Sequence, residues 1–386
     1  MSAPNTATGH FQTFFRWKQY ATRYVFLVLG MAISAWAVLV PYAKASLTVN
    51  EAQLGMLLLL IGIGALLAIF IAGKLTNHFG CRKTLNVSTT VFLVSLVALA
   101  FTTNTVLFGV LLLIFGLSSG VIDIAMNIQA SLIERRTNRR LMSGFHGMYS
   151  AGGFFGALIV SMLLKVGLAI TWSMTILCLV MLLGLMLIFQ RYLDPTGMRE
   201  AASHSAIRLK GIVVFLGLLC GIFYMADGTI LDWGALFMMG KGCETEMSGL
   251  AFSVFSVATA IGRLKGDRLL EAFGVPKVIA ASGVVAIIGF AVILMTSGTW
   301  FSLAGFTIIG LGVSNLIPIL FSYISRQKEV PVSQALSTVT TLGYLGLMAG
   351  PPAMGHIAHQ HGLYAVFGTV ACMVLAAAIA GWKVLR

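Results

Sequence analysis

The chain consists almost entirely of apolar runs of about 20 residues, the length of helix that crosses the ~30 Å hydrocarbon core of a bilayer. Short polar segments separate these runs. Only 10% of the residues are charged, whereas soluble domains contain about 25%, so most of the surface is expected to face lipid. We predict an all-α membrane protein with twelve transmembrane helices, which begin near residues 22, 52, 84, 105, 144, 168, 211, 247, 277, 299, 336 and 362.

Two segments, 73–83 and 267–277, share a pattern of glycine and basic residues at the end of an apolar run. A shift of 194 residues superimposes them and also lays Gly116 onto Gly310. A repeat in the same orientation is typical of transporters built from two six-helix lobes with the site between them. Within the two segments, the shift pairs Lys74 with Arg268, Gly80 with Gly274, and Lys83 with Lys277.

The repeat also predicts the domain organisation. The polar stretch 193–210 is the only sizeable linker in the sequence, and it lies between the two copies. We therefore expect a cytoplasmic N-terminal lead over 1–21, a first six-helix lobe over 22–192, a cytoplasmic linker over 193–210 and a second six-helix lobe over 211–386.

The net charge of +13 would suggest nucleic-acid binding in a soluble protein, but the positions of the basic residues favour another explanation. With the N-terminus in the cytoplasm, all but three of the 25 Lys and Arg residues fall on cytoplasmic segments, the exceptions being Lys44, Lys165 and Lys241. Cytoplasmic loops of membrane proteins carry such an excess. We predict a multi-pass protein of the bacterial inner membrane with both termini cytoplasmic, whose basic loops contact anionic lipids and bind no nucleic acid.

The segment 73–83 resembles the loop signature of the major facilitator superfamily, which is Gly, three residues, Asp-Arg, any residue, Gly and then basic residues. Asn77 stands at the acidic position of the first copy and Glu271 at that of the second. In the family this loop helps to lock the cytoplasmic gate, and the neutral Asn77 favours a lock in which Glu271 pairs with a basic residue. The gate residues that the resemblance implies are Gly73, Asn77, Gly80, Arg82, Arg135, Arg268 and Glu271.

The fourth span carries Gly116, Gly120, Asp123 and Asn127 on one helical stripe. Asp123 lies twelve residues before Arg135, roughly 18 Å into the membrane. A carboxylate at that depth is costly and is a functional candidate, because gaining or losing a proton changes what it can bind. We interpret Asp123 as a proton-coupling group; a purely structural hydrogen bond that pins the span is the alternative. The pair Asp123 and Asn127 resembles the fucose permease-like branch of the superfamily.

Other polar and aromatic groups fall within the predicted spans. Asp227 is a second proton-coupling candidate or a gate residue, and Asp232 is expected to be a solvated residue at the external mouth. Trp36 would stack on a solute or simply pack in the core, and His146 would line the cavity or be a structural histidine. The predicted substrate-binding residues are Trp36, Asn127, Tyr149, Tyr224, Asn315 and Tyr344.

Several chemistries are not supported by the sequence. The five cysteines are scattered without paired spacing, which predicts neither a disulfide framework nor a zinc site. His356, His359 and His361 have ligand-like spacing, but no acidic residue or cysteine accompanies them, so an exposed loop is expected there. Because no nucleotide-binding loop or catalytic set is present, we expect no enzyme activity, no metal and no cofactor.

These observations predict a monomeric secondary transporter that takes up a small polar, sugar-like organic solute together with protons, by alternating access of its lobes. A proton-driven exporter of metabolites or drugs on the same fold is the first alternative. A sensor or partner subunit that has the fold but no longer transports is the second. Exporters tolerate diverse ligands, importers discriminate between epimers, and a sensor binds solute without flux.

Overall fold

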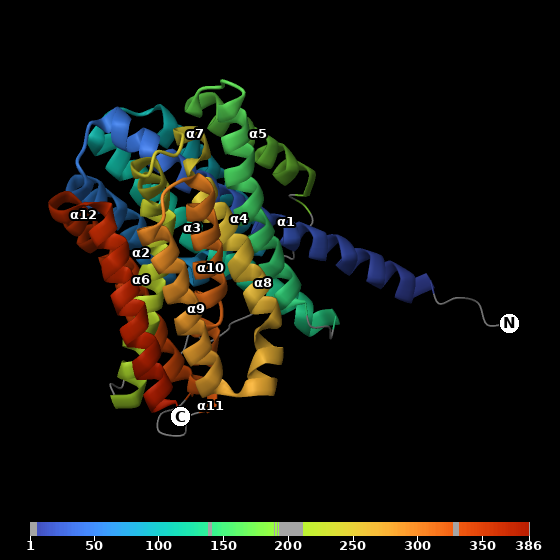
Figure 1. Ribbon diagram of the computed structural model, residues 1–386. Coiled ribbons are helices and arrows are strands. Elements are labelled where there is room, and N and C mark those ends of the chain that lie inside the picture. The colour runs from blue at the N-terminus through green and yellow to red at the C-terminus, as the bar shows by residue number, and fades with distance from the viewer. Residues whose placement is uncertain are drawn as a thin grey trace.

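The computed structural model describes residues 6–137, 141–188, 190, 192, 211–326 and 332–385, and these ranges contain helices and no strands (Figure 1). Ten of the helical segments are long and apolar enough to cross a membrane. The predicted linker 193–210 lies outside the described residues. The helices are α1 (Thr6–Leu47), α2 (Glu51–Phe101), α3 (Thr105–Thr137), α4 (Met142–Lys165), α5 (Ile170–Ile188), α6 (Gly211–Gly240), α7 (Thr245–Ser248), α8 (Leu250–Phe273), α9 (Val275–Met295), α10 (Thr299–Val313), α11 (Leu316–Arg326) and α12 (Val332–Val384).

Two of these helices are too long to be single spans. α2 has 51 residues and α12 has 53, so each would measure more than ~75 Å at 1.5 Å per residue. α2 loses its helical backbone at Gly80 and α12 at Gly362, where φ is 76° and 79°. Each therefore consists of two span-length parts. The count of twelve spans depends on counting both parts, and it stays a prediction.

The repeat that was read from the sequence is visible in the backbone. Gly80 has φ 76° and ψ 162°, and Gly274, which follows α8, has φ 76° and ψ 161°. Residues with a Cβ rarely adopt this conformation, so glycine is required at both positions. The same sequence pattern thus makes the same sharp bend in each half of the chain.

Most of the expected N-terminal lead over 1–21 is helical, because α1 begins at Thr6; its cytoplasmic location stays a prediction. Phe15 is buried and the Lys18 ammonium donates a hydrogen bond to the Tyr192 carbonyl at 2.5 Å. The helix of the first apolar run thus extends toward the N-terminus, and this extension contacts the rest of the molecule.

The two ends of the molecule differ in charge. We call the end at which α2 bends at Gly80 and α8 stops at Gly274 the basic end, because Lys74, Arg82 and Lys83 lie beside the first bend. The other end, where α1 finishes at Leu47, is the opposite end.

The two halves of the chain touch closely near the opposite end. A Cβ on Gly55 of α2 would lie 2.4 Å from the Pro351 carbonyl of α12, so only glycine allows the two helices to pack so closely. Beyond this contact, Glu51 pairs with Lys44 at 2.5 Å and lies 3.8 Å from His359 of α12. These contacts hold the opposite end closed in this conformation.

Candidate solute cavity between the two halves

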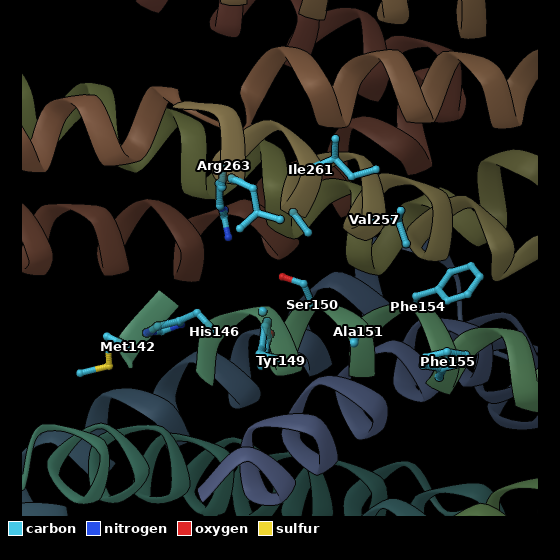
Figure 2. Close-up of a pocket in the computed structure, with 13 residues that line it drawn as sticks. Met142, His146, Tyr149, Ser150, Ala151, Phe154, Phe155, Val257, Ile261 and Arg263 are labelled. Carbon is cyan, nitrogen blue, oxygen red and sulfur yellow. The ribbon is translucent and has the colours of Figure 1, made fainter. Parts of the chain in front are cut away.

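A cavity of about 560 Å³ lies between α4 of the first half and α8 of the second. Figure 2 shows the two helices facing each other across it, with α4 below and α8 above. The cavity occupies the part of both helices nearer the basic end. Its lining includes His146, Tyr149, Ser150, Phe154, Val257 and Arg263.

The wall formed by α4 presents polar groups at helical spacing. His146, Tyr149 and Ser150 are three and four residues apart and therefore share one face. The start of α4 is fixed because the Glu134 carboxylate of α3 accepts hydrogen bonds from the backbone N–H groups of Leu141 and Met142. A carboxylate there also offsets the positive end of the helix dipole.

The wall formed by α8 carries a cation, Arg263. Its Nε donates a hydrogen bond to the Ser314 carbonyl at 3.3 Å. That carbonyl lies between α10 and α11, and the residue four positions on is Pro318, which has no N–H to donate. The break in the tenth span therefore leaves an acceptor that Arg263 satisfies, and this bond positions the guanidinium at the cavity (Figure 2).

The two predicted proton-coupling residues lie beside this cavity. Asp123 and Asp227 are half-buried and both interact electrostatically with Tyr149, while Asp227 also interacts with Arg263. The Asn127 amide donates to the Asp123 carboxylate at 3.3 Å and to its backbone carbonyl at 2.8 Å. The structure thus brings the two carboxylates toward one tyrosine from α3 and α6.

The remaining predicted solute contacts divide into two groups. Tyr224 and Tyr344 are half-buried, and their rings stack with centroids 6.3 Å apart; Tyr344 also interacts electrostatically with Asp123. Trp36 and Asn315 are buried away from the cavity lining. Asn315 instead donates to the Gly262 carbonyl at 3.1 Å, a contact that ties the break in the tenth span to α8.

Asp232 corrects the sequence interpretation. It was expected at a solvated mouth, but it is only 7% exposed and accepts a hydrogen bond from Trp36 Nε1 at 3.4 Å. Trp36 belongs to α1 and packs on the rings of Phe108 and Phe115 of α3. The position of Asp232 along α6 does not reveal this partner, because Trp36 belongs to the other half of the chain. Trp36 covers the carboxylate of Asp232 and keeps it from solvent.

The predicted gate residues lie at or near the basic end. Gly80 makes the bend there, no described residue lies within 4 Å of a Cβ placed on Gly73, and Arg268 and Glu271 are exposed. Among the described residues Glu271 forms no ion pair within 4.0 Å in this conformation. The roles of Gly73, Asn77, Gly80, Arg82, Arg135, Arg268 and Glu271 as a gate stay a prediction.

The three histidines near the opposite end lie on a helix and not on the expected loop. His356, His359 and His361 belong to α12 and are exposed, and His359 approaches Glu51. Across the part of the chain that the structure describes, no group of three or more His, Cys, Asp or Glu residues is arranged to hold a metal ion.

The cavity-lining residue that sequence reasoning missed is Arg263. The uneven distribution of basic residues assigned it to a cytoplasmic segment, whereas it lies within the candidate span Thr245–Gly266. The signal that could have found it is its depth in α8, thirteen residues after Leu250 and ten before Phe273. An arginine at that depth needs a counter-charge, a polar cavity or water.

Comparisons with known proteins agree with this architecture. The sequence pattern of the Major Facilitator Superfamily matches residues 24–326 and, in a second match, 243–386. The chain belongs to the major facilitator superfamily. An uncharacterized MFS-type transporter of Yersinia pestis is 36% identical over 370 residues, which cover 96% of each chain.

Solved structures show the same fold at low sequence identity. A point mutant of the nucleoside transporter NupG superposes with a TM-score of 0.79 and 14% identity, over 95% of this chain and 100% of that one. A D-xylose-proton symporter superposes with a TM-score of 0.71 and 16% identity, over 96% and 98% of the two chains. The protein is therefore a multi-pass membrane transporter of this superfamily and not an enzyme.

Proposed function

We propose that this transporter takes up a small polar, sugar-like organic solute together with protons, through the cavity between α4 and α8. The observation that carries the proposal is that Arg263, His146 and Tyr149 line one cavity, and that Asp123 and Asp227 interact electrostatically with that tyrosine. A cavity lined by hydrogen-bonding side chains suits a hydroxyl-bearing solute, and carboxylates beside it supply groups that a proton can neutralise.

The comparisons support the class of solute. Two transporters with this fold are a nucleoside transporter and a D-xylose-proton symporter, and both kinds of solute carry several hydroxyl groups. Tyr224, Tyr344 and Asn127 would add hydrogen bonds when the solute moves deeper than the described cavity. Trp36 would stack on the solute only in another conformation, in which its ring is exposed to the cavity.

The orientation follows from the charge distribution. We propose that the basic end faces the cytoplasm of a bacterium, since Lys and Arg gather there. The conformation described here would then be closed to the outside and accessible from the cytoplasm. Movement of one lobe against the other, in a single chain acting as a monomer, would expose the same site to the other side.

The experiment that tests this proposal is uptake into proteoliposomes under an imposed pH gradient. Replacing Asp123 by Asn is expected to remove the stimulation of uptake by the gradient, because the amide can neither bind nor release the coupled proton. The matched variant Asn127→Ala keeps the carboxyl group and is expected to raise KM while uptake still responds to the gradient. Unchanged proton dependence in Asp123→Asn would refute the coupling role.

The same preparation separates the alternatives. Solute that leaves the vesicles when protons enter would identify a proton-driven exporter. Solute that shifts the melting temperature without any flux would identify a sensor with this fold, since a ligand at 100 times its Kd stabilises the folded state by about 2.7 kcal/mol.

A further inference from the structure

We propose that the transported solute carries one carboxylate group and that Arg263 binds it, an inference that rests on the proposed function. Arg263 is exposed to the cavity although it lies within a membrane span. It lies three residues before the end of that candidate span, roughly 4.5 Å along the helix axis at 1.5 Å per residue. A cation that lies inside a span and faces a cavity is a candidate for an ion or substrate path.

The guanidinium is positioned but forms no ion pair with the side chains that the structure describes. Its Nε is engaged by the Ser314 carbonyl, and no carboxylate of the described residues lies within 4.0 Å of its nitrogens. The N–H groups at the tip of the side chain therefore remain available. Their planar fork matches the two oxygens of a carboxylate, which it can bind through two parallel hydrogen bonds.

The opposite wall offers groups for the rest of the solute. Figure 2 shows His146, Tyr149 and Ser150 on α4, across the cavity from Arg263. A hydroxyl or imidazole side chain can donate and accept hydrogen bonds, so these residues suit the hydroxyl groups of a sugar. The charged end and the hydroxyl-bearing part of one molecule would thus contact different lobes.

The charges around the cavity limit the negative charge that a solute bound by Arg263 can bring. Asp227 interacts electrostatically with Arg263, and Asp123 interacts with Tyr149. One fixed cation accompanied by two carboxylates would repel a phosphate monoester, which carries about −1.5 to −2 charges at pH 7. A carboxylate adds one charge, and one proton on Asp227 would offset it.

The test compares solutes that differ only in the anionic group, by thermal shift and by binding to the purified full-length protein. The pairs are D-glucuronate with D-glucose and D-gluconate with D-sorbitol, and glucose 6-phosphate is added as the phosphate arm. For at least one pair the carboxylate is expected to bind roughly 10- to 150-fold more tightly than its neutral analogue, the ratio for a charge-assisted hydrogen bond. The phosphate is expected to bind more weakly than the carboxylate.

Variants then assign the preference to Arg263. Arg263→Gln is expected to bind the carboxylate and its neutral analogue equally, and Arg263→Lys is expected to fall between Gln and wild type because it keeps the charge but loses the fork. Lys265→Gln is the matched control, because Lys265 is an exposed cation of the same helix that does not line the cavity. It is expected to retain wild-type binding.

The outcomes separate the two proposals. If the neutral members of both pairs bind as tightly as the carboxylates, or glucose 6-phosphate binds most tightly, the carboxylate inference is overturned while proton-coupled uptake stands. If a carboxylate is preferred equally by wild type and by Arg263→Gln, the assignment to Arg263 is wrong. If no compound binds and none is transported, both proposals fail. The comparison of carboxylates with their neutral analogues uses the wild-type protein, so its result does not depend on whether a variant folds.

Discussion

Replacing Trp36 by Phe is expected to loosen the closed opposite end of the transporter. Among the described residues, the indole N–H of Trp36 donates the one side-chain hydrogen bond that Asp232 accepts, at 3.4 Å, and both residues are almost fully buried. Trp36 comes from the first half of the chain and Asp232 from the second. The bond therefore exists only while the two halves meet, whereas water can hydrate the carboxylate once they separate.

The size of the effect follows from this difference between the two conformations. The packing of Trp36 on Phe108 and Phe115 lies within the first half, so its loss weakens both conformations equally. Losing the hydrogen-bond donor leaves a buried acceptor unsatisfied in the closed state alone, at a cost of about 1–3 kcal/mol. The ratio of open to closed molecules should therefore rise about 5- to 150-fold at the opposite end.

Cysteine labelling measures this ratio. Val38 is fully buried and lies against Gly249, so a Val38→Cys thiol reacts with a membrane-impermeant maleimide only when that end opens. The background would carry Cys372→Ser, because Cys372 is exposed and the other four cysteines are buried. Trp36→Phe in this background is expected to be labelled faster in proportion to the open fraction.

Trp233→Phe is the matched control for this experiment. Trp233 is adjacent to Asp232 and fully buried, but its Nε1 has no hydrogen-bond partner in the part of the chain that the structure describes, so its removal leaves none of those acceptors unsatisfied. Asp232→Asn, which keeps an acceptor oxygen for the indole, is expected to have a smaller effect than Trp36→Phe. Equal labelling rates in Trp36→Phe, Trp233→Phe and the parent would refute the reasoning.

Two further predictions concern glycines. Gly55→Val should also speed labelling at the opposite end, since even a Cβ would lie 2.4 Å from a carbonyl of α12; a rate equal to the parent would show that the helices can adjust. Gly80→Ala and Gly274→Ala should each destabilise the purified protein by about 1–3 kcal/mol, the usual cost of a strained backbone conformation. Gly368→Ala, which has open space around it, should melt like wild type, and unequal losses at the two bends would contradict their equivalence.

The sequence predicted the fold well because the relevant signals are local. The length of an apolar run determines whether a helix can span, and the glycine pattern around Gly80 and Gly274 marks the same bend in each half. The site was predicted less completely, because its members meet only when the halves pack together. Asp123 and Tyr149 were identified as polar groups in apolar spans, but Arg263 was counted with the loop cations and Asp232 was expected to be solvated.

The partner of Asp232 illustrates why. Nothing in the sequence around Trp36 distinguishes an indole that donates across the lobes from one that only packs, and the two residues are 196 positions apart. In the same way, the expected solute contact of Asn315 is replaced by a contact with the Gly262 carbonyl. The position of a residue along a helix can be counted from the sequence, but the residue that it contacts on another helix cannot be predicted in this way.

The proline in the tenth span has a mechanical consequence for the cavity. Because Pro318 frees the carbonyl that holds Arg263, the direction of the guanidinium is set by α10 and α11 as well as by its own helix. A tilt of that broken span would swing the cation relative to the other lobe. The affinity of Arg263 for a bound anion would then change as the helix moves. Release of the solute would be coupled directly to that movement.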